Sequence, residues 1–462
     1  MYRLVVRAKK DSDAAKAMVR AFYPQWGIEV YTLKGARTPD RALEALGEAI
    51  SEDAYVIVLL GREDAELAAL ERETPLNVVF HVIRYSKVRN ARIYNLFREL
   101  ERARAALRNS VTWRGGSYVF THKAPPLFEC REPAYDVFLG LGRGFKVRLE
   151  ELVGELGENP LLVRMLGGLH AIYSGPVKVA EAVFPDDGVP RGVRLKDDRV
   201  DVGEDELIVS NEEVIRAHET VSLGLLKRWD VEIDEVLVPV SGGKDSTAAL
   251  ALARKAFGAA KLTAVYVDTG VDFPQNREYV ERVVAKLGVR LEVEYASVRE
   301  EVRARGFPAH GSGRWCTALK LEALRRAIRR VAQTSSRPII VVGDRDAESE
   351  ARSRRPPVRV EDGILTLAPL KQWGTALVQL YLLREGLGLN PLYLAGFYRI
   401  GCYICPALRS WELYVMTRDE ELAKSLRGAP LLDEYLRHRG VSRRWGSGAR
   451  SLGGSATPRG RE

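Results

Sequence analysis

The sequence predicts an α/β protein built around a doubly wound parallel sheet, preceded by a small α/β domain and a β-rich middle domain. Three observations predict this. Over residues 232–415, apolar runs of strand length alternate with helical segments, which is the pattern of a parallel sheet with crossover helices. Residues 1–108 repeat that alternation on a smaller scale. Residues 109–225 instead carry short β-like runs punctuated by glycine and proline.

The first 108 residues are predicted to form the small α/β domain. Strands are expected where short apolar runs occur, and helices where apolar residues recur at spacings of three and four. The strands are residues 2–8, Tyr55–Leu60 and Val78–Ile83, and the helices are Asp13–Ala21, Pro39–Ile50 and the arginine-rich Ile93–Leu107. No motif in this domain assigns it a role.

Residues 109–225 are predicted to form the middle domain. Within residues 190–224 we expect a Gly-Val entry, a strand over the letters GEDELIVS and one further strand. This stretch resembles the closing half of a PUA domain, a small barrel-like module that binds RNA. A β-rich linker domain without that role is the alternative.

Residues 226–420 are predicted to form the third domain, which holds the parallel sheet. Its strands are expected to be rich in valine and isoleucine because both of their faces are covered. The strands are Val236–Val240, Leu262–Asp268, Leu291–Tyr295 and Pro338–Val342, with helices at Thr247–Phe257, Asn276–Leu287 and Lys320–Val331.

Composition and the chain ends limit the function classes. Hydrophobic residues make up 46% and charged residues 29% of the 462 residues, as in ordinary globular proteins. No run of eighteen apolar residues and no signal-peptide core occur, so we expect a cytoplasmic protein without a membrane partner. A formal charge of +9 favours an anionic partner, and abundant Arg and Glu suit a thermophile. Residues 421–462 are predicted to be a basic, largely disordered tail.

The loop after the first strand of the third domain carries the clearest chemical signal. Residues 236–247 are VLVPVSGGKDST. The glycines let the backbone approach a ligand closely, and the following helix directs its first N–H groups at an anion. Lys244 adds a charge, and Ser241, Ser246 and Thr247 add hydroxyl groups. The loop therefore predicts a pyrophosphate site without the spacing of a Walker loop. A plain surface turn is the alternative.

A series of motifs along the chain resembles one family. The loop resembles the PP-loop (SGGxDS) of the adenine nucleotide alpha-hydrolases, which have a Rossmann-like fold. The segments that follow resemble those of the phosphoadenosine phosphosulfate (PAPS) reductase family. They are DTGVDFP from Asp268, RWCTALK from Arg314, GDRDAESEAR from Gly343, and NPLYLAGFYRIGCYICP from Asn390, with PLKQWGTALVQLY upstream of the last. Gln275 replaces an acidic residue of the family pattern.

This resemblance implies a set of site residues. Lys244 and Asp245 are the catalytic candidates, with Cys316 as a candidate nucleophile, and Asp245 or Asp268 would hold Mg²⁺ if the nucleotide is ATP. Asp268 as a simple turn cap is the alternative. The implied nucleotide contacts are Ser241, Gly242, Gly243, Lys244, Asp245, Ser246, Thr247, Asp268, Thr269, Gly270, Arg314, Lys320, Gly343, Arg345, Arg352 and Arg399.

The cysteines indicate a metal or redox role. Cys316, Cys402 and Cys405 keep the spacing of the iron–sulfur members of the family, although Thr317 stands where a second cysteine of a tandem pair is usual. Three thiolates would leave one iron of a 4Fe–4S cluster open, zinc is the other metal, and plain packing at a turn is the alternative. Cys130 is a further candidate ligand.

Two reactions and one binding role fit this pattern. The first is reductase-type cleavage of PAPS or adenosine phosphosulfate (APS), but the E-C-G-L-H segment of the reductases is absent because the tail has no cysteine. The second is ATP-dependent adenylation and sulfur transfer to tRNA, with tRNA held by the middle domain and the basic surface. Either reaction implies a reductant or a sulfur-donor protein as partner. A non-catalytic nucleotide- or RNA-binding protein is the third possibility, and the oligomeric state is open.

Overall fold

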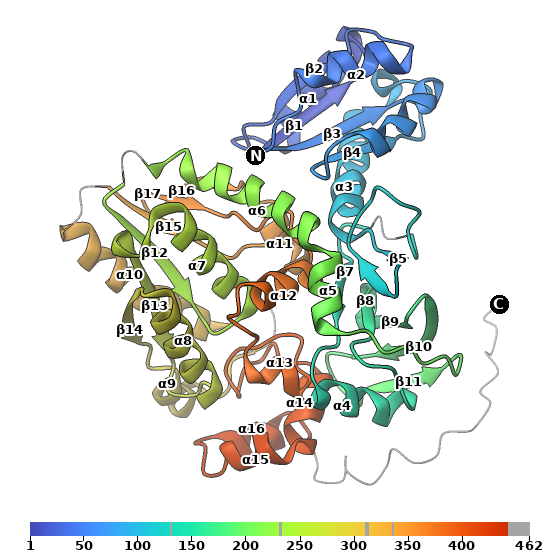
Figure 1. Cartoon of the computed structure of the whole chain (residues 1–462). Helices are drawn as coiled ribbons and strands as arrows, with labels where there is room; N and C mark the ends of the chain where they lie inside the picture. Colours follow the sequence, from blue (N-terminus) through green and yellow to red (C-terminus); the bar gives the residue numbers. More distant parts are fainter. Residues whose placement is uncertain (130–131, 231–232, 310–313, 335–336, 442–462) are drawn as a thin grey trace, which may run out of the picture.

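The chain folds into three units that follow one another in sequence (Figure 1). The computed structural model describes residues 1–129, 132–230, 233–309, 314–334 and 337–441. A small α/β domain is followed by an antiparallel sheet domain and then by a larger α/β domain with the SGGKDS loop, which confirms the predicted fold class. Within the described residues, no helix has both the length and the apolar character needed to cross a membrane.

The N-terminal domain is a parallel sheet with helices on both faces. Its strand order is β2-β1-β3-β4, and β2 is the one strand of this sheet that the sequence pattern missed. Apolar side chains from alternate positions of β3 enter two separate cores, one on each face. The elements are β1 (Tyr2–Val6), α1 (Lys9–Phe22), β2 (Glu29–Thr32), α2 (Pro39–Gly47), β3 (Tyr55–Leu60), β4 (Val78–Val82) and α3 (Ile93–Asn109).

The middle domain is a five-stranded antiparallel sheet of order β11-β10-β9-β8-β7, preceded by a small hairpin. Its elements are β5 (Thr112–Arg114), β6 (Ser117–Val119), β7 (Asp136–Leu139), α4 (Arg143–Val153), β8 (Leu161–Arg164), β9 (Leu169–Ser174), β10 (Val177–Val183) and β11 (Arg191–Arg194).

The strand predicted over GEDELIVS is wrong. These residues form helix α5 (Glu204–Ser210), which leads into α6 (Glu212–Lys227). Three acidic residues occupy the first turn of α5, where the helix dipole favours negative charge. The further strand expected after GEDELIVS is wrong too, because residues 212–227 are helical. The resemblance to a PUA domain therefore loses both of these strands.

The third domain has the predicted doubly wound sheet, with strand order β14-β13-β12-β15-β17-β16 and all pairs parallel except β16 with β17. Helices α7 and α8 pack on one face and α10 on the other. The sheet elements are β12 (Glu235–Val240), α7 (Lys244–Phe257), β13 (Leu262–Asp268), α8 (Pro274–Leu287), β14 (Arg290–Tyr295), α9 (Val298–Arg305), α10 (Trp315–Thr334), β15 (Pro338–Val341), α11 (Glu350–Ser353), β16 (Val358–Glu361) and β17 (Ile364–Leu367).

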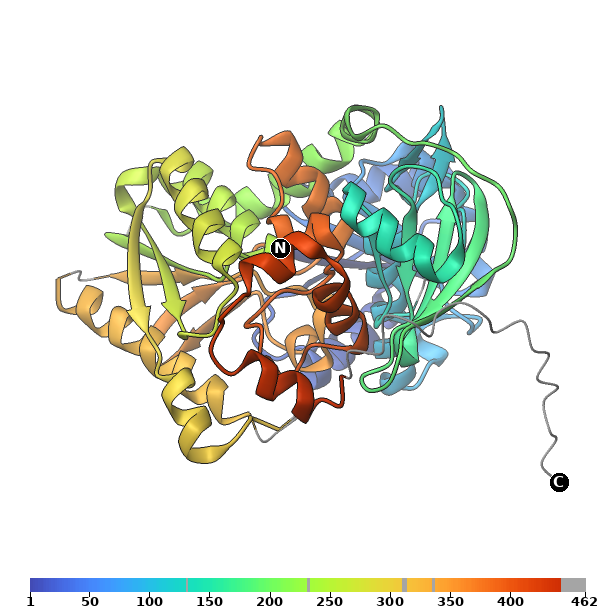
Figure 2. The same ribbon diagram turned by 90° about the horizontal axis from the view of Figure 1, so that it is seen from below.

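The last helices lie between the sheet of the third domain and the middle domain, and they cover the lower side of the molecule (Figures 1 and 2). They are α12 (Thr375–Arg384), α13 (Pro391–Ala395), α14 (Ser410–Arg418), α15 (Glu420–Ser425) and α16 (Leu432–His438). The tail predicted to be disordered from residue 421 is thus folded as far as residue 441, and residues 442–462 lie outside the described residues. Apolar positions such as Leu422, Leu426 and Tyr435 explain the difference, since all three are buried.

Tyr435→Ala is expected to destabilise the third domain because the Tyr435 side chain is 1% exposed in the core under α16. Its hydroxyl also donates to the carbonyl oxygen of Cys405 at 2.5 Å. Loss of a buried aromatic ring costs about 3–5 kcal/mol. Thermal unfolding should show a lowered melting temperature, whereas Tyr94→Ala, at a position 58% exposed, should melt like the wild type. Equal melting temperatures for the two variants would contradict the packing of α16.

Candidate functional site

The SGGKDS loop joins the carboxyl end of β12 to the amino end of α7, as predicted. Gly242 has a φ of +76°, a conformation that favours glycine. Gly343, two residues after β15, approaches the loop so closely that a Cβ there would lie 2.5 Å from the carbonyl oxygen of Asp245. Two glycines therefore fix the loop, one by its backbone angle and one by lack of a side chain.

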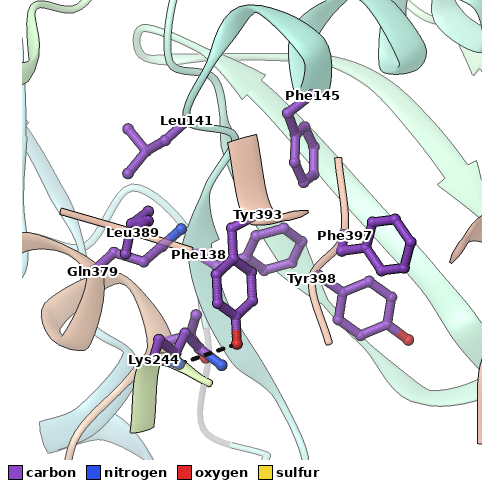
Figure 3. Close-up of a pocket in the computed structure, with 10 residues that line it drawn as sticks. Phe138, Leu141, Phe145, Lys244, Gln379, Leu389, Tyr393, Phe397 and Tyr398 are labelled. Carbon is purple, nitrogen blue, oxygen red and sulfur yellow. Dashed lines mark hydrogen bonds between the residues drawn. The ribbon is translucent and has the colours of Figure 1, made fainter. Parts of the chain in front are cut away.

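Lys244 is the first residue of α7 and is buried at the mouth of this loop. Its backbone N–H donates to the hydroxyl of Tyr393 (3.2 Å), as Figure 3 shows, and its Nζ donates to Asp245 Oδ2 (3.1 Å). Its side chain lines two adjoining small cavities. A buried ammonium at a helix N-terminus is an arrangement that attracts an anion.

The hydroxyl groups of the loop chiefly stabilise the turn. Ser246 Oγ and Thr247 Oγ1 each donate to the carbonyl oxygen of Gly243 at 3.0 Å. Ser241 is exposed at the mouth, and its Oγ lies 3.4 Å from Ser246 Oγ. Ser241 is therefore the loop hydroxyl most available to a ligand.

Arg345 lies at the centre of a buried ionic network. Its Nε donates to Asp245 (2.6 Å), its Nη1 to Asp136 (3.1 Å) and its Nη2 to Thr375 (2.8 Å). Burial alone would raise the pKa of both carboxyl groups, but Arg345 outweighs it and holds the pKa of Asp136 and of Asp245 below the usual range. The Arg345 guanidinium is therefore engaged by protein groups and positions the residues around Lys244. Its side chain also lines the cavity beside Lys244, and its contact with nucleotide stays a prediction.

The next residue, Asp346, joins the site to the N-terminal domain. Its carboxylate pairs with Arg104 of α3 and with Lys371, whose Nζ lies 2.6 Å from Oδ1. Arg108 of α3 is 4.0 Å away. Two consecutive residues after β15 thus contact different domains: Arg345 pairs with the middle domain and Asp346 with the N-terminal domain.

The turn after β13 has the predicted shape. Asp268 caps it, with Oδ1 accepting from the Gly270 N–H at 2.8 Å, and its side chain is 30% exposed. Thr269 is buried, and both its N–H and its hydroxyl donate to Asp272 at 2.9 Å. Gly270 has a φ of +70°. The turn lies at the same carboxyl edge of the sheet as the SGGKDS loop, where ligands bind in such sheets.

The three described cysteines gather in one core cluster beside this turn. Cys402 Sγ accepts from Lys320 Nζ at 3.0 Å and lies 3.4 Å from Thr269 Oγ1. Burial raises the pKa of Cys402 to about 12 and raises the pKa of Cys316. Among the described residues, no three His, Cys, Asp or Glu side chains are arranged to hold a metal ion, so the residues as placed do not fit the predicted metal group. Cys130 lies outside the described residues.

The remaining predicted residues differ in their positions. Arg399 is exposed and lines the cavity beside Lys244. Arg352 is 40% exposed and pairs with Glu348 and Asp344. Arg314 is exposed just before α10, whereas Lys320, a residue of that helix, faces Cys402.

Sequence reasoning missed the residues that the middle domain supplies. Asp136 and Arg164, from β7 and β8, line the same cavity as Lys244, and no motif marks either of them. Tyr393 belongs to the NPLY motif, but only the structure shows its hydroxyl contacting the loop.

Known proteins resemble the third domain. Residues 235–408 match the family model described as the phosphoadenosine phosphosulfate reductase domain, which confirms the family predicted for this part of the chain. An uncharacterised protein of Methanocaldococcus jannaschii is 32% identical over 228 residues, 48% of this chain and 47% of the relative. A sulfate adenylyltransferase subunit 2 of Alkalilimnicola ehrlichii is 29% identical, covering 38% and 63%. A phosphoadenosine 5'-phosphosulfate reductase of Photorhabdus laumondii is 27% identical, covering 30% and 57%.

The chain spans about half the length of the curated relatives that it matches. Among solved structures, the PAPS reductase from Candida auris in its phosphate complex is 21% identical, with a TM-score of 0.33, covering 42% of this chain and 96% of that one.

Arg345→Met is expected to destabilise the protein strongly because it leaves Asp136 and Asp245 buried without their main cation. Breaking a buried ion pair on one side costs about 3–5 kcal/mol. Denaturant unfolding should show this loss, and Arg352→Met, at a half-exposed position, should cost under about 1 kcal/mol. A similar small loss in both variants would contradict the central place of Arg345.

Glu412→Gln is expected to stabilise the protein at alkaline pH. Burial raises the pKa of Glu412 from 4.5 to about 7. A carboxyl group whose pKa is raised in the folded state contributes fully to folding stability at pH values below its unfolded-state pKa. This contribution is lost as pH rises through the folded-state pKa. The variant should match the wild type near pH 4 and exceed it by about 3 kcal/mol above pH 8. Glu421→Gln, at a fully exposed position, is the control and should have the stability of the wild type at every pH. If the stability of Glu412→Gln showed the same pH dependence as that of the wild type, this prediction would be wrong.

Proposed function

We propose that residues 235–408, a PAPS reductase domain by their family match, bind an adenine nucleotide at the SGGKDS loop and carry out sulfur chemistry on it. Reductase-type cleavage of a sulfonucleotide, PAPS or APS, is the activity that we favour. One observation carries the proposal. Lys244 is buried at the N-terminus of α7, and its side chain lines a cavity that Arg399 also lines. Preorganised cations of this kind stabilise phosphate or sulfate charge as it develops in a transition state.

Each loop residue has a defined part in this proposal. Lys244 and the first N–H groups of α7 would bind the oxyanion, and Ser241 would donate from the mouth. Asp245 orients Lys244 and is held by Arg345. Its carboxylate is thereby engaged, so the partly exposed Asp268 is the better candidate to hold Mg²⁺ if the nucleotide is ATP.

Cleavage of a sulfonucleotide needs a thiolate that attacks the sulfur of the sulfate group and expels the nucleotide through its phosphate oxygen. The S–O bond to the nucleotide breaks as the S–S bond forms, which leaves a thiosulfonate on the cysteine. A reductant, such as a dithiol protein, then breaks this S–S bond, releases sulfite, restores the cysteine thiol and ends as a disulfide. Cys316 is our candidate, because it is less buried than Cys402. Because its pKa is raised, a base must assist loss of its proton.

A second candidate function is ATP-dependent adenylation followed by sulfur transfer to tRNA. The contact of Cys402 Sγ with Thr269 favours it, since this contact brings a sulfur atom to the nucleotide edge of the sheet. The formal charge of +9 suits a nucleic acid partner, and a relative named as a sulfate adenylyltransferase subunit supports ATP as the nucleotide. A 4Fe–4S cluster or zinc on Cys316, Cys402 and Cys405 belongs to this candidate and requires a rearrangement of the thiols.

Calorimetric titration with PAPS, APS and ATP tests both candidates. We expect binding of a sulfonucleotide, and Lys244→Ala should weaken it about 10- to 100-fold because a charge-assisted contact is lost. Lys255→Ala, at the far end of the same helix, is the control and should leave affinity unchanged. Selective ATP binding would favour sulfur transfer to tRNA, and binding of none of the three would refute the proposal.

A further inference from the structure

The cavity beside Lys244 is formed by two domains. Lys244, Arg345 and Arg399 come from the third domain, whereas Asp136 and Arg164 come from strands β7 and β8 of the middle domain. Arg164 is the last residue of β8. A family match that begins at residue 235 does not include it.

The charges that face this cavity are unbalanced. Four basic side chains line it, against two carboxylates, those of Asp136 and Glu348. Both carboxylates are already engaged, Asp136 by Arg345 and Thr375, and Glu348 by Arg352 and the N–H of Arg345. Counting Asp245 behind Lys244, one positive charge remains in excess, which an anion would neutralise.

Arg164 itself has unused donors. Its Nη2 donates to the carbonyl oxygens of Ala347 and of Ala134, the latter at 3.4 Å. In the described part of the chain its Nε and Nη1 form no hydrogen bond and the guanidinium has no ion pair. Arg164 is half-buried. Burial lowers its pKa, and the nearby carboxylate of Asp136 opposes that shift.

The cavity has room for one small oxyanion and has an apolar wall. Its volume is about 40 Å³, whereas a single water needs about 10–15 Å³. Phe138 and Tyr398 form the wall, and both rings also line the adjoining cavity that Figure 3 shows. The Tyr398 hydroxyl is buried and has no hydrogen-bond partner within the described residues. An apolar wall strengthens the interaction of a bound anion with nearby cations.

We propose that Arg164 of the middle domain binds the anionic end of the nucleotide, the terminal phosphate or the sulfate group, opposite Lys244 and Arg399. The inference rests on the proposed function of the SGGKDS loop. The nucleotide site is then complete only where the middle and third domains meet, and the middle domain takes part in binding the small substrate.

Calorimetry on the full chain tests this with two Arg164 variants and a control. Arg164→Gln removes the charge but keeps an amide donor toward Ala347, and Arg164→Lys keeps the charge. Arg191→Ala removes an exposed arginine from β11, at the other edge of the same sheet. Each variant is titrated with PAPS, APS, ATP and inorganic pyrophosphate, and its melting temperature is measured in parallel.

We expect nucleotide affinity to fall about 30-fold in Arg164→Gln, to recover to within about fivefold of wild type in Arg164→Lys, and to stay unchanged in Arg191→Ala. Loss of affinity for APS and PAPS alone would assign the sulfate group to Arg164, and an equal loss for ATP and pyrophosphate would assign a phosphate. Wild-type affinity in a folded Arg164→Gln variant would overturn the inference. Equal loss in both Arg164 variants would also overturn it, because packing would then explain the effect. If the wild type binds no nucleotide, the proposed function fails, and the pyrophosphate titration alone decides whether Arg164 binds an oxyanion.

Discussion

The pairing of Arg345 with Asp136 and Asp245 is the interaction on which the site depends. It joins the first turn of α7 to the first strand of the middle-domain sheet, so the SGGKDS loop is held from both sides. The neighbouring Asp346 binds Arg104 on α3 in the same way. Two adjacent residues after β15 therefore fix both preceding domains against the edge of the sheet where a ligand would bind.

A buried network of this kind adds little net stability compared with apolar packing, since each charge loses its water. Its value lies in geometry. Arg345 offers donors in fixed directions, and it accepts only one arrangement of Asp136, Asp245 and Thr375. The cost of disturbing that arrangement keeps Lys244 at the cavity, so Arg345 acts through the position of its neighbours.

The fold of the third domain could be predicted because its signals are local. Strands β12 and β13 are continuous apolar runs, and the SGGKDS loop follows the first of them directly. Helix α5 was missed because its short apolar pattern resembles that of a strand. Helix α16 was missed because its sequence is as polar as a disordered tail. In both segments tertiary packing determines the structure. The part of the site from Asp136 and Arg164 was not predictable either, since nothing in β7 or β8 indicates that these strands face a loop far along the chain. The cysteines were found by spacing, but spacing alone did not reveal that Lys320 would face Cys402.

The contact between Gly343 and the carbonyl oxygen of Asp245 has a wider consequence. At this point main chain touches main chain, so the separation of β15 from the start of α7 is fixed by atoms that every residue type shares. This backbone contact acts together with the side-chain pairing of Arg345 and Asp245, which joins the same two segments. A single methyl group at position 343 would push the two segments apart and widen the mouth of the site. The width of the mouth of the SGGKDS loop is thus set by the backbone, and any side chain at position 343 would have to displace it.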